Sequence, residues 1–147
     1  MEAAFPPPVP SAPPHIPPPG FVEYVPTGGF MRTLGLVYTR QETDGSITAG
    51  LFIHERHLNT HQVAHGGLLA TVADSILGFN AGKAATAPVV TVNLSVSYLG
   101  RVKEHDWLEV AVRIERTGRR LVFASCLGQV GGQPVVKAEG VFSVVAS

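Results

Sequence analysis

Cysteine and charge are both scarce in this sequence. Of the 147 residues only Cys126 is a cysteine, so no disulfide can form within the chain and nothing favours an oxidising compartment. Charged residues make up 15%, with 11 basic and 11 acidic side chains, so there is no basic field to collect nucleic acid or anionic lipid. We therefore expect no nucleic-acid partner and a cytoplasmic location.

Long apolar runs are also missing. No uninterrupted apolar stretch approaches the length of a membrane span, and residues 1–20 lack the basic start and apolar core of a secretory signal. The chain is nonetheless 45% hydrophobic, a high fraction for a small domain with so few charges. We expect no membrane partner, and some of the apolar surface should lie between subunits.

Proline is concentrated at one end of the chain. Residues 1–20 hold nine of the twelve prolines, and such a segment favours polyproline II over the interior of a sheet or helix. We predict an extended proline-rich arm over residues 1–20. The remaining residues 21–147 are enough for one domain with a single core.

Alternating segments predict about six strands, two before and four after one central helix. Residues 30–40 and 46–55 flank the turn signal Asp44-Gly45 and are typical of a hairpin. Further strands are expected over residues 89–99, 107–116, 120–130 and 134–146, with turns at Thr117-Gly118 and Gly131-Gly132. No parallel strand-helix-strand alternation occurs, so the predicted class is α+β.

The strand over residues 89–99 has an unusually polar second face. Its alternation assigns five apolar residues to one face and four polar residues to the other. The apolar set is Val90, Val92, Leu94, Val96 and Tyr98, and the polar set is Thr91, Asn93, Ser95 and Ser97. The strand is therefore half buried, or its polar face belongs to a site.

The central helix, predicted from Gly67 to about Phe79, carries a lone carboxylate on a face of small residues. One half of its circumference is apolar, whereas the other half holds Asp74 among alanine, threonine, serine and glycine, without a basic residue three or four positions away. A carboxylate packed closely there loses solvation unless it is hydrogen-bonded or used in chemistry. Asp74 is either a functional residue or a structural anchor for nearby backbone.

The tripeptide His65-Gly66-Gly67 opens this helix. Backbone N–H groups of a first helical turn are free, and glycine lets a ligand carbonyl approach them closely. The turn is thus a candidate oxyanion hole, and the alternative is a simple tight turn into the helix.

Asn59, His65-Gly66-Gly67 and Asp74 together form the pattern N-x5-HGG-x6-D. This pattern resembles the signature of PaaI-like hot-dog acyl-CoA thioesterases, and the likeness runs from about Leu34-Gly35 to the C-terminus. The resemblance implies a hot-dog fold, in which an antiparallel sheet of five to six strands wraps one long helix. It also implies homodimers that join through a continuous sheet, assemble into homotetramers and build each active site from two subunits.

The same resemblance implies a role for each residue. The amide of Gly66, with Gly67 beside it, would polarise the thioester carbonyl. Asn59 would orient substrate or water, and His65 would shape the carbonyl pocket. Asp74 of the opposite subunit would act as general base or nucleophile, and Thr91 lies about where a water-positioning hydroxyl is expected. The implied reaction is hydrolysis of an aryl- or medium-chain acyl-CoA to free acid and CoA, without a separate cofactor.

Substrate contacts outside this pattern are less specific. The CoA phosphates could meet Arg119 and Arg120, which stand with Arg101, Lys103 and Arg116 near predicted strand ends, although solvated surface charges are the commoner reading. Four aromatic residues could line an acyl pocket or belong to the core. They are Phe52, Phe79, Tyr98 and Trp107.

Competing chemistries find less support. His54, His57, His61 and His65 are spaced by three or four residues, but one helix cannot converge all four on one ion, so we expect no metal. Cys126 falls in an alternating strand without a base and is interpreted as core. Two alternatives stay open, a hot-dog hydratase or dehydratase and a hot-dog protein that binds acyl-CoA without turnover.

Overall fold

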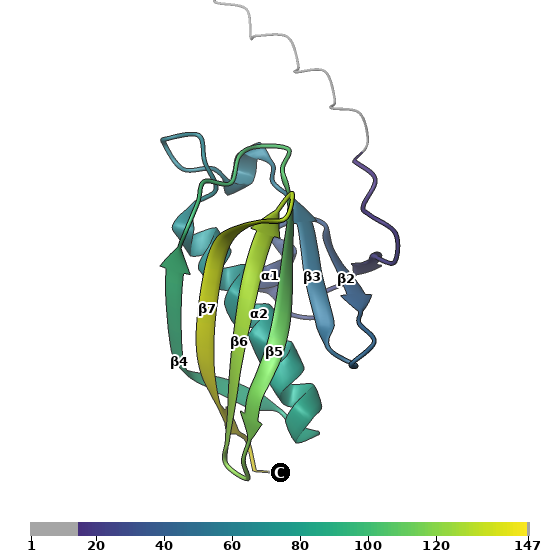
Figure 1. Cartoon of the computed structure of the whole chain (residues 1–147), viewed down its shortest axis with the longest axis vertical. Helices are drawn as coiled ribbons and strands as arrows, with labels where there is room; N and C mark the ends of the chain where they lie inside the picture. Colours follow the sequence, from purple (N-terminus) through teal and green to yellow (C-terminus); the bar gives the residue numbers. More distant parts are fainter. Residues whose placement is uncertain (1–14, 147) are drawn as a thin grey trace, which may run out of the picture.

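One antiparallel sheet curves around a single long helix in residues 15–146, the part of the chain that the computed structural model describes (Figure 1). The seven strands lie in the order β1-β2-β3-β5-β6-β7-β4, and every neighbouring pair is antiparallel. The strands are β1 (Val22–Tyr24), β2 (Val37–Gln41), β3 (Ile47–Phe52), β4 (Val89–Tyr98), β5 (Trp107–Thr117), β6 (Leu121–Val130) and β7 (Gln133–Val144). The helices are α1 (Gly29–Arg32), the short 3-10 helix η1 (Glu55–His57) and α2 (Gly66–Ala85). The expected α+β hot-dog architecture is confirmed, with one strand more than predicted.

Two further expectations concern the proline-rich arm and membrane-spanning segments. Residues 1–14 of the expected proline-rich arm lie outside the described residues. Within residues 15–146, no helix is long and apolar enough to cross a membrane.

Helix α2 packs its apolar side against the sheet. The buried residues recur at helical spacing and are Leu68, Leu69, Val72, Ala73, Ile76, Leu77, Asn80 and Ala81. The predicted helix is confirmed, but it continues beyond Phe79 to Ala85. Asn80 explains the extension, because its side chain accepts a hydrogen bond from the Ile47 amide and donates one to the Ile47 carbonyl, both at 2.9 Å. A buried amide thus fastens the last turns of α2 to the start of β3.

The strand predicted to begin at Phe30 is wrong in its first half. Residues Gly29–Arg32 form α1, and the amide and hydroxyl of Thr33 both donate to the Phe30 carbonyl. Gly35 then has a φ of +85°, a left-handed conformation that interrupts an extended strand, so β2 starts only at Val37. The hairpin of β2 and β3 around the predicted turn is confirmed. The unpredicted strand β1 pairs with the outer side of β2.

The alternation predicted for β4 holds from Leu94 to Tyr98 but fails before it. A bulge between Thr91 and Asn93 makes Val92 an extra residue of the strand. Thr91 pairs with Phe142, which is 1% exposed in the core, so Thr91 also faces α2. The bulge therefore moves Thr91 from the face predicted to be polar to the face where Leu94 lies, and this change positions the candidate site.

An aromatic cluster covers the face of β2, β3 and β5 that points away from α2. It contains Phe52 and Trp107, whose ring centroids lie 4.6 Å apart, and Phe21, whose ring meets Trp107 edge-on at 5.0 Å. The neighbouring positions of β3 are the ones buried against α2. Because strand residues alternate between faces, Phe52 and Trp107 cannot line a pocket beside the helix, and that interpretation is wrong for these two residues.

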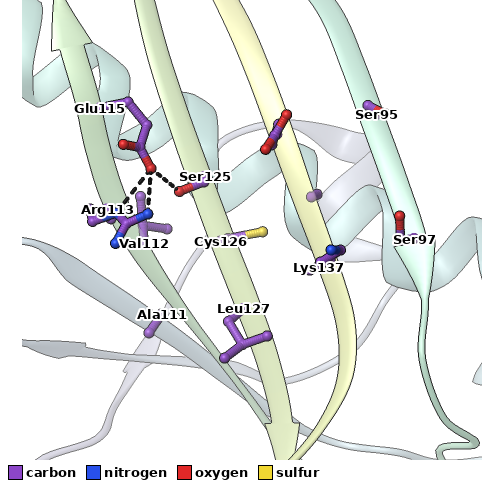
Figure 2. A pocket seen from close by; sticks show the side chains of 12 residues that line it. Ser95, Ser97, Ala111, Val112, Arg113, Glu115, Ser125, Cys126, Leu127 and Lys137 are labelled. Carbon is purple, nitrogen blue, oxygen red and sulfur yellow. Dashed lines mark hydrogen bonds and ion pairs between the residues drawn. The ribbon is translucent and has the colours of Figure 1, made fainter.

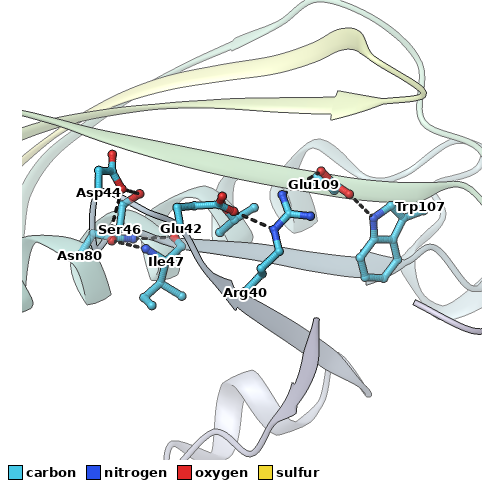
Figure 3. Close-up of polar contacts among 9 residues, drawn as sticks. Arg40, Glu42, Asp44, Ser46, Ile47, Asn80, Trp107 and Glu109 are labelled. Carbon is cyan, nitrogen blue, oxygen red and sulfur yellow. Dashed lines mark hydrogen bonds and ion pairs between the residues drawn. The ribbon is translucent and has the colours of Figure 1, made fainter. Parts of the chain in front are cut away.

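Polar contacts on the same face link β2 to β3 and also to β5, where Glu109 lies 3.8 Å from the Arg40 guanidinium (Figure 3). Glu42 accepts hydrogen bonds from Arg40 at 2.8 Å and from the Thr48 hydroxyl at 2.9 Å, and the Arg40 contact holds the pKa of Glu42 below its usual value. The indole N–H of Trp107 donates to Glu109 at 2.9 Å. We assign this network to the stability of the sheet.

Gly50 leaves room for the rings of Trp107 and Phe21 to pack directly against the backbone of β3. A Cβ atom at Gly50 would overlap the ring of Trp107 and would lie 3.1 Å from the ring of Phe21. We therefore expect Gly50→Ala to lower the free energy of unfolding by about 1–3 kcal/mol, the usual cost of overpacking. Urea denaturation measures this change. The matched control is Gly28→Ala, where the added Cβ meets nothing within 4 Å, and equal losses in both variants would contradict the prediction.

Candidate active site

The first turn of α2 offers one free backbone amide. His65 is the N-cap residue, and its ring Nδ1 accepts a hydrogen bond from the Gly67 amide at 2.8 Å. Among the described residues, the Gly66 amide has no hydrogen-bond partner. It lies at the positive end of the helix dipole, where a developing negative charge is stabilised. Gly66 is thus the available oxyanion donor, whereas the amide of Gly67, expected to assist it, already has His65 as partner.

The loop that leads into α2 is shaped by Asn59. The side-chain oxygen of Asn59 accepts hydrogen bonds from the backbone amides of His61 at 2.9 Å and Val63 at 3.3 Å. The backbone amide of Asn59 donates to the Val63 carbonyl at 2.8 Å. Asn59 is half buried, and its side-chain N–H groups have no partner among the described residues. The residue therefore orders the turn before His65 and keeps donors available to a ligand.

The four closely spaced histidines do not converge. His57 is buried, with Nδ1 accepting from the His54 amide at 2.9 Å and Nε2 lying 2.7 Å from the Leu34 carbonyl, so both ring nitrogens are occupied. Burial lowers the pKa of His57, which keeps the ring neutral. Within residues 15–146, no group of three or more His, Cys, Asp or Glu side chains is placed to hold a metal ion.

Asp74 lies half buried on the side of α2 that faces β4. Its Oδ1 accepts a hydrogen bond from the Thr91 hydroxyl at 2.7 Å. None of the ion pairs among the described residues includes Asp74, and its other oxygen has no partner there. The alternative, that Asp74 anchors nearby backbone, is not supported, because its one partner among the described residues is the side chain of Thr91. Asp74 is held in orientation and keeps one oxygen for chemistry.

Tyr98 fastens the opposite end of β4 to the same helix. Its hydroxyl donates to the Gly66 carbonyl at 2.8 Å, and a Cβ atom on Gly66 would lie only 3.2 Å from the Tyr98 ring. Glycine at this position therefore lets Tyr98 approach the first turn. Sequence reasoning considered Tyr98 for an acyl pocket or for the core and missed this contact, for which the available signal was its place on the apolar face of the strand.

Gly66 and Asp74 cannot serve one reacting carbonyl within one chain. They are eight residues apart on a straight helix, which separates them by about 12 Å along its axis. Beside them, β4 is the last strand of the sheet and carries neither a charged residue nor a proline over Val89–Tyr98. Such an unprotected edge is open to pairing with another strand.

Arg119 and Arg120 lie elsewhere in the protomer. Both are exposed in the turn between β5 and β6, directly before Leu121. Leu121 and Val90 both pair with Ser143, so this turn is at the end of the sheet where β4 begins. The arginines are therefore remote from Gly66, which neighbours the other end of β4.

Residues 61–137 match the family model of the thioesterase superfamily. The chain belongs to this superfamily. A Pseudomonas aeruginosa protein provisionally named an esterase is 36% identical over 127 residues, which are 85% of this chain and 95% of that protein. Human acyl-coenzyme A thioesterase 13 is 28% identical over 101 residues, which are 65% of this chain and 69% of that protein.

Solved structures share the fold of this thioesterase. A hypothetical thioesterase protein of Streptococcus pneumoniae, solved with coenzyme A, has a TM-score of 0.70 and 25% identity over 76% of this chain and 90% of that one. Escherichia coli PaaI has a TM-score of 0.75 and 17% identity over 82% and 87% of the two chains. The resemblance to PaaI-like hot-dog thioesterases is confirmed for fold and family, and the chain is a thioester hydrolase. The roles of individual residues stay predictions.

One hollow of the thioesterase lies on the outer face of the sheet, away from these groups. It is an open groove of about 600 Å³ over β4, β5, β6 and β7 (Figure 2). Its side chains include Glu115, which accepts hydrogen bonds from Ser125 at 2.6 Å and Arg113 at 2.9 Å on the face away from α2.

Cys126 is buried in β6 and burial raises its pKa to about 11, which confirms its interpretation as a core residue.

Proposed function

We propose that this thioesterase hydrolyses an aryl- or medium-chain acyl-CoA to the free acid and CoA, in a homodimer whose active sites use both subunits. The observation that carries the proposal is a pair of hydrogen bonds along β4. Thr91, near one end of the strand, holds Asp74, and Tyr98, at the other end, contacts Gly66. Asp74 is thereby aligned with one end of the unpaired edge of β4, and Gly66 is aligned with the other end.

A two-fold axis would bring the two halves together. When two β4 edges pair in antiparallel fashion about an axis near Leu94 and Ser95, Thr91 of one copy comes level with the partner's Tyr98. Asp74 of one copy then comes level with the partner's Gly66 amide. Two features support this arrangement. The β4 edge has no protecting charge or proline, and Gly66 and Asp74 of one chain are separated by about 12 Å along α2. Two such dimers would associate into the homotetramer expected from the sequence.

The chemistry needs only water besides the thioester. The substrate carbonyl oxygen accepts a hydrogen bond from the Gly66 amide, which stabilises the negative charge of the tetrahedral intermediate. In the general-base path, Asp74 takes a proton from water as the oxygen attacks the carbonyl carbon, and the C–S bond then breaks as the CoA thiolate leaves and is protonated. In the nucleophilic path, the Asp74 carboxylate attacks the carbonyl carbon, and the C–S bond breaks as the CoA thiolate leaves and is protonated. Water then hydrolyses the resulting anhydride, which releases the acid and restores the Asp74 carboxylate. Thr91 orients the carboxylate in both paths.

The acyl-CoA substrate class is supported by relatives and by the location of the site. The Streptococcus pneumoniae protein was solved with coenzyme A, and the human relative is named an acyl-coenzyme A thioesterase. Arg119 and Arg120 stay candidates for the CoA phosphates, since they lie exposed at the sheet end where β4 begins. Asn59 and His65 would contact the substrate from the loop before α2.

Free-thiol release from a panel of aryl- and aliphatic acyl-CoAs tests this function. We expect a kcat/KM on the order of 10⁴ M⁻¹s⁻¹ or higher for at least one member of the panel. Tight binding of acyl-CoA without thiol release would instead indicate a binding protein. Turnover of an enoyl-CoA with the thioester left intact would indicate a hydratase, and either result would reject the proposed hydrolysis.

A further inference from the structure

Tyr98 lies directly against the glycine that carries the free amide of α2. Its hydroxyl donates a hydrogen bond to the Gly66 carbonyl at 2.8 Å. A Cβ atom on Gly66 would lie 3.2 Å from the ring carbon Cζ of Tyr98, 3.3 Å from its hydroxyl oxygen and 3.5 Å from Cε1. The ring edge that bears the hydroxyl therefore covers one side of the Gly66 Cα, while the hydroxyl holds the carbonyl of the same residue.

Gly66 stands at a position where few contacts fix the backbone. It is the first residue of α2, its amide has no partner among the described residues, and glycine leaves the backbone freer than any other residue. The amide of Gly67, in contrast, is held by the His65 ring. Within residues 15–146, the one side-chain hydrogen bond to Gly66 comes from Tyr98. Tyr98 is therefore the side chain that can fix the direction of the Gly66 N–H.

The sheet fixes Tyr98 in turn. Tyr98 pairs with Val136, which is 1% exposed, so its side chain lies on the face of β4 that points towards α2. Directly after it, the amides of Leu99 and Gly100 both donate to the Val135 carbonyl, at 2.9 and 3.2 Å. The backbone is thus tied to β7 at Tyr98 and just beyond it. A ring carried by such a strand holds a neighbouring amide more precisely than a group on a loop would.

Tyr98 also lies on the edge where the proposed dimer forms, and it is 53% exposed in the single chain. In the antiparallel pairing of two β4 edges, the partner's Thr91 comes level with Tyr98, so the second chain would cover the exposed side of the ring. Rotation of the ring away from Gly66 would then be blocked. The edge that brings the carboxylate to the site would also secure the amide opposite it.

We propose that Tyr98 is a positioning residue for thioester hydrolysis, which aims the Gly66 amide at the carbonyl oxygen of the substrate. This inference rests on the proposed hydrolysis and adds a residue outside the pattern N-x5-HGG-x6-D. An oxyanion donor is effective when it is aligned before the negative charge develops, because reorientation during the reaction costs free energy. Tyr98 contacts Gly66 and acts through its amide. If Tyr98 only filled space, the ring alone would suffice and the hydroxyl would be dispensable.

Tyr98→Phe separates the hydroxyl from the ring and tests the inference. It should lower kcat with the preferred acyl-CoA by a factor of about five to ten, the worth of one hydrogen bond, and change KM by less than about twofold. Tyr38→Phe is the matched control. The Tyr38 ring lies 5.7 Å from that of Trp107 on the face away from α2, and its hydroxyl makes no hydrogen bond among the described residues. This change should leave kcat unaltered.

Combination with Gly66→Pro distinguishes positioning of the amide from general support of the fold. Gly66→Pro leaves no amide to position, so adding Tyr98→Phe should cost nothing further, and the double variant should match Gly66→Pro in kcat. Loss of general support would instead lower kcat by the same factor in both backgrounds. Urea denaturation checks folding, and size-exclusion chromatography checks assembly.

If Gly66→Pro does not fold, the comparison of Tyr98→Phe with Tyr38→Phe decides alone. An active enzyme in which Tyr98→Phe leaves kcat unchanged, or lowers it equally with and without the Gly66 amide, would overturn the positioning role and leave the hydrolase function intact. A protein inactive on every acyl-CoA would overturn both.

Discussion

Asp74→Asn will lower kcat for acyl-CoA hydrolysis by a factor on the order of 100 or more. The change keeps the size of the side chain and the hydrogen bond that it accepts from Thr91, but an amide is neither a base nor a nucleophile for this reaction. KM should change little, because the lost interaction acts mainly in the transition state. Steady-state measurement of thiol release with the preferred acyl-CoA provides both constants.

The control for this substitution is Asp44→Asn in the turn between β2 and β3. Asp44 accepts hydrogen bonds from the amide and hydroxyl of Ser46, a role that asparagine fills in turns, so activity should stay near that of the unmodified protein. Full hydrolysis by folded Asp74→Asn would remove this carboxylate from the mechanism. Single-turnover hydrolysis in isotope-labelled water distinguishes the two paths, because only the nucleophilic one leaves label in Asp74.

Gly66→Pro should lower kcat by a similar factor, on the order of 100, by deleting a single N–H group. Proline is tolerated at the first position of a helix, and the preceding residue His65 already has an extended ψ of 136°, as proline requires. Gly66→Ala is the matched control, since it adds a similar contact with the Tyr98 ring but keeps the amide. If alanine and proline reduce kcat equally, the contact with Tyr98 and not the amide is responsible.

Mixing the two inactive proteins tests whether each site uses two chains. A dimer of one Asp74→Asn chain and one Gly66→Pro chain has one site with both groups intact and one site with neither. Random reassociation makes half of the dimers mixed, so activity should recover to about one quarter of that of the unmodified protein. If each chain held a complete site, mixing would restore nothing, and the proposed shared site would have to be abandoned.

The sequence was informative where chemistry depends on spacing along one helix or strand. The position of Asp74 on the side of α2 opposite its apolar residues followed from periodicity, because burial repeats every 3.6 residues along a helix. The first-turn amide could be located in the same way, since a helix that begins at a known residue leaves known donors free.

Features that depend on a tertiary partner could not be predicted. The bulge at Val92 preserves a regular-looking alternation but reverses the direction of Thr91, and only the pairing with β7 reveals it. Asn80 reads as a residue for the end of a helix, yet its amide is buried against β3. The capping of Gly67 by the His65 ring likewise depends on a rotamer. Such contacts are set by side-chain orientation, which the order of residues does not encode locally.

The distance between Gly66 and Asp74 on one helix also has a kinetic consequence. A newly synthesised chain would fold with half of the chemistry at each end of its edge strand, and it would stay inert towards thioesters until it met a second chain. Specific activity should then fall on dilution, with the square of chain concentration governing the rate in the most dilute samples. Assembly would act as the step that switches on hydrolysis.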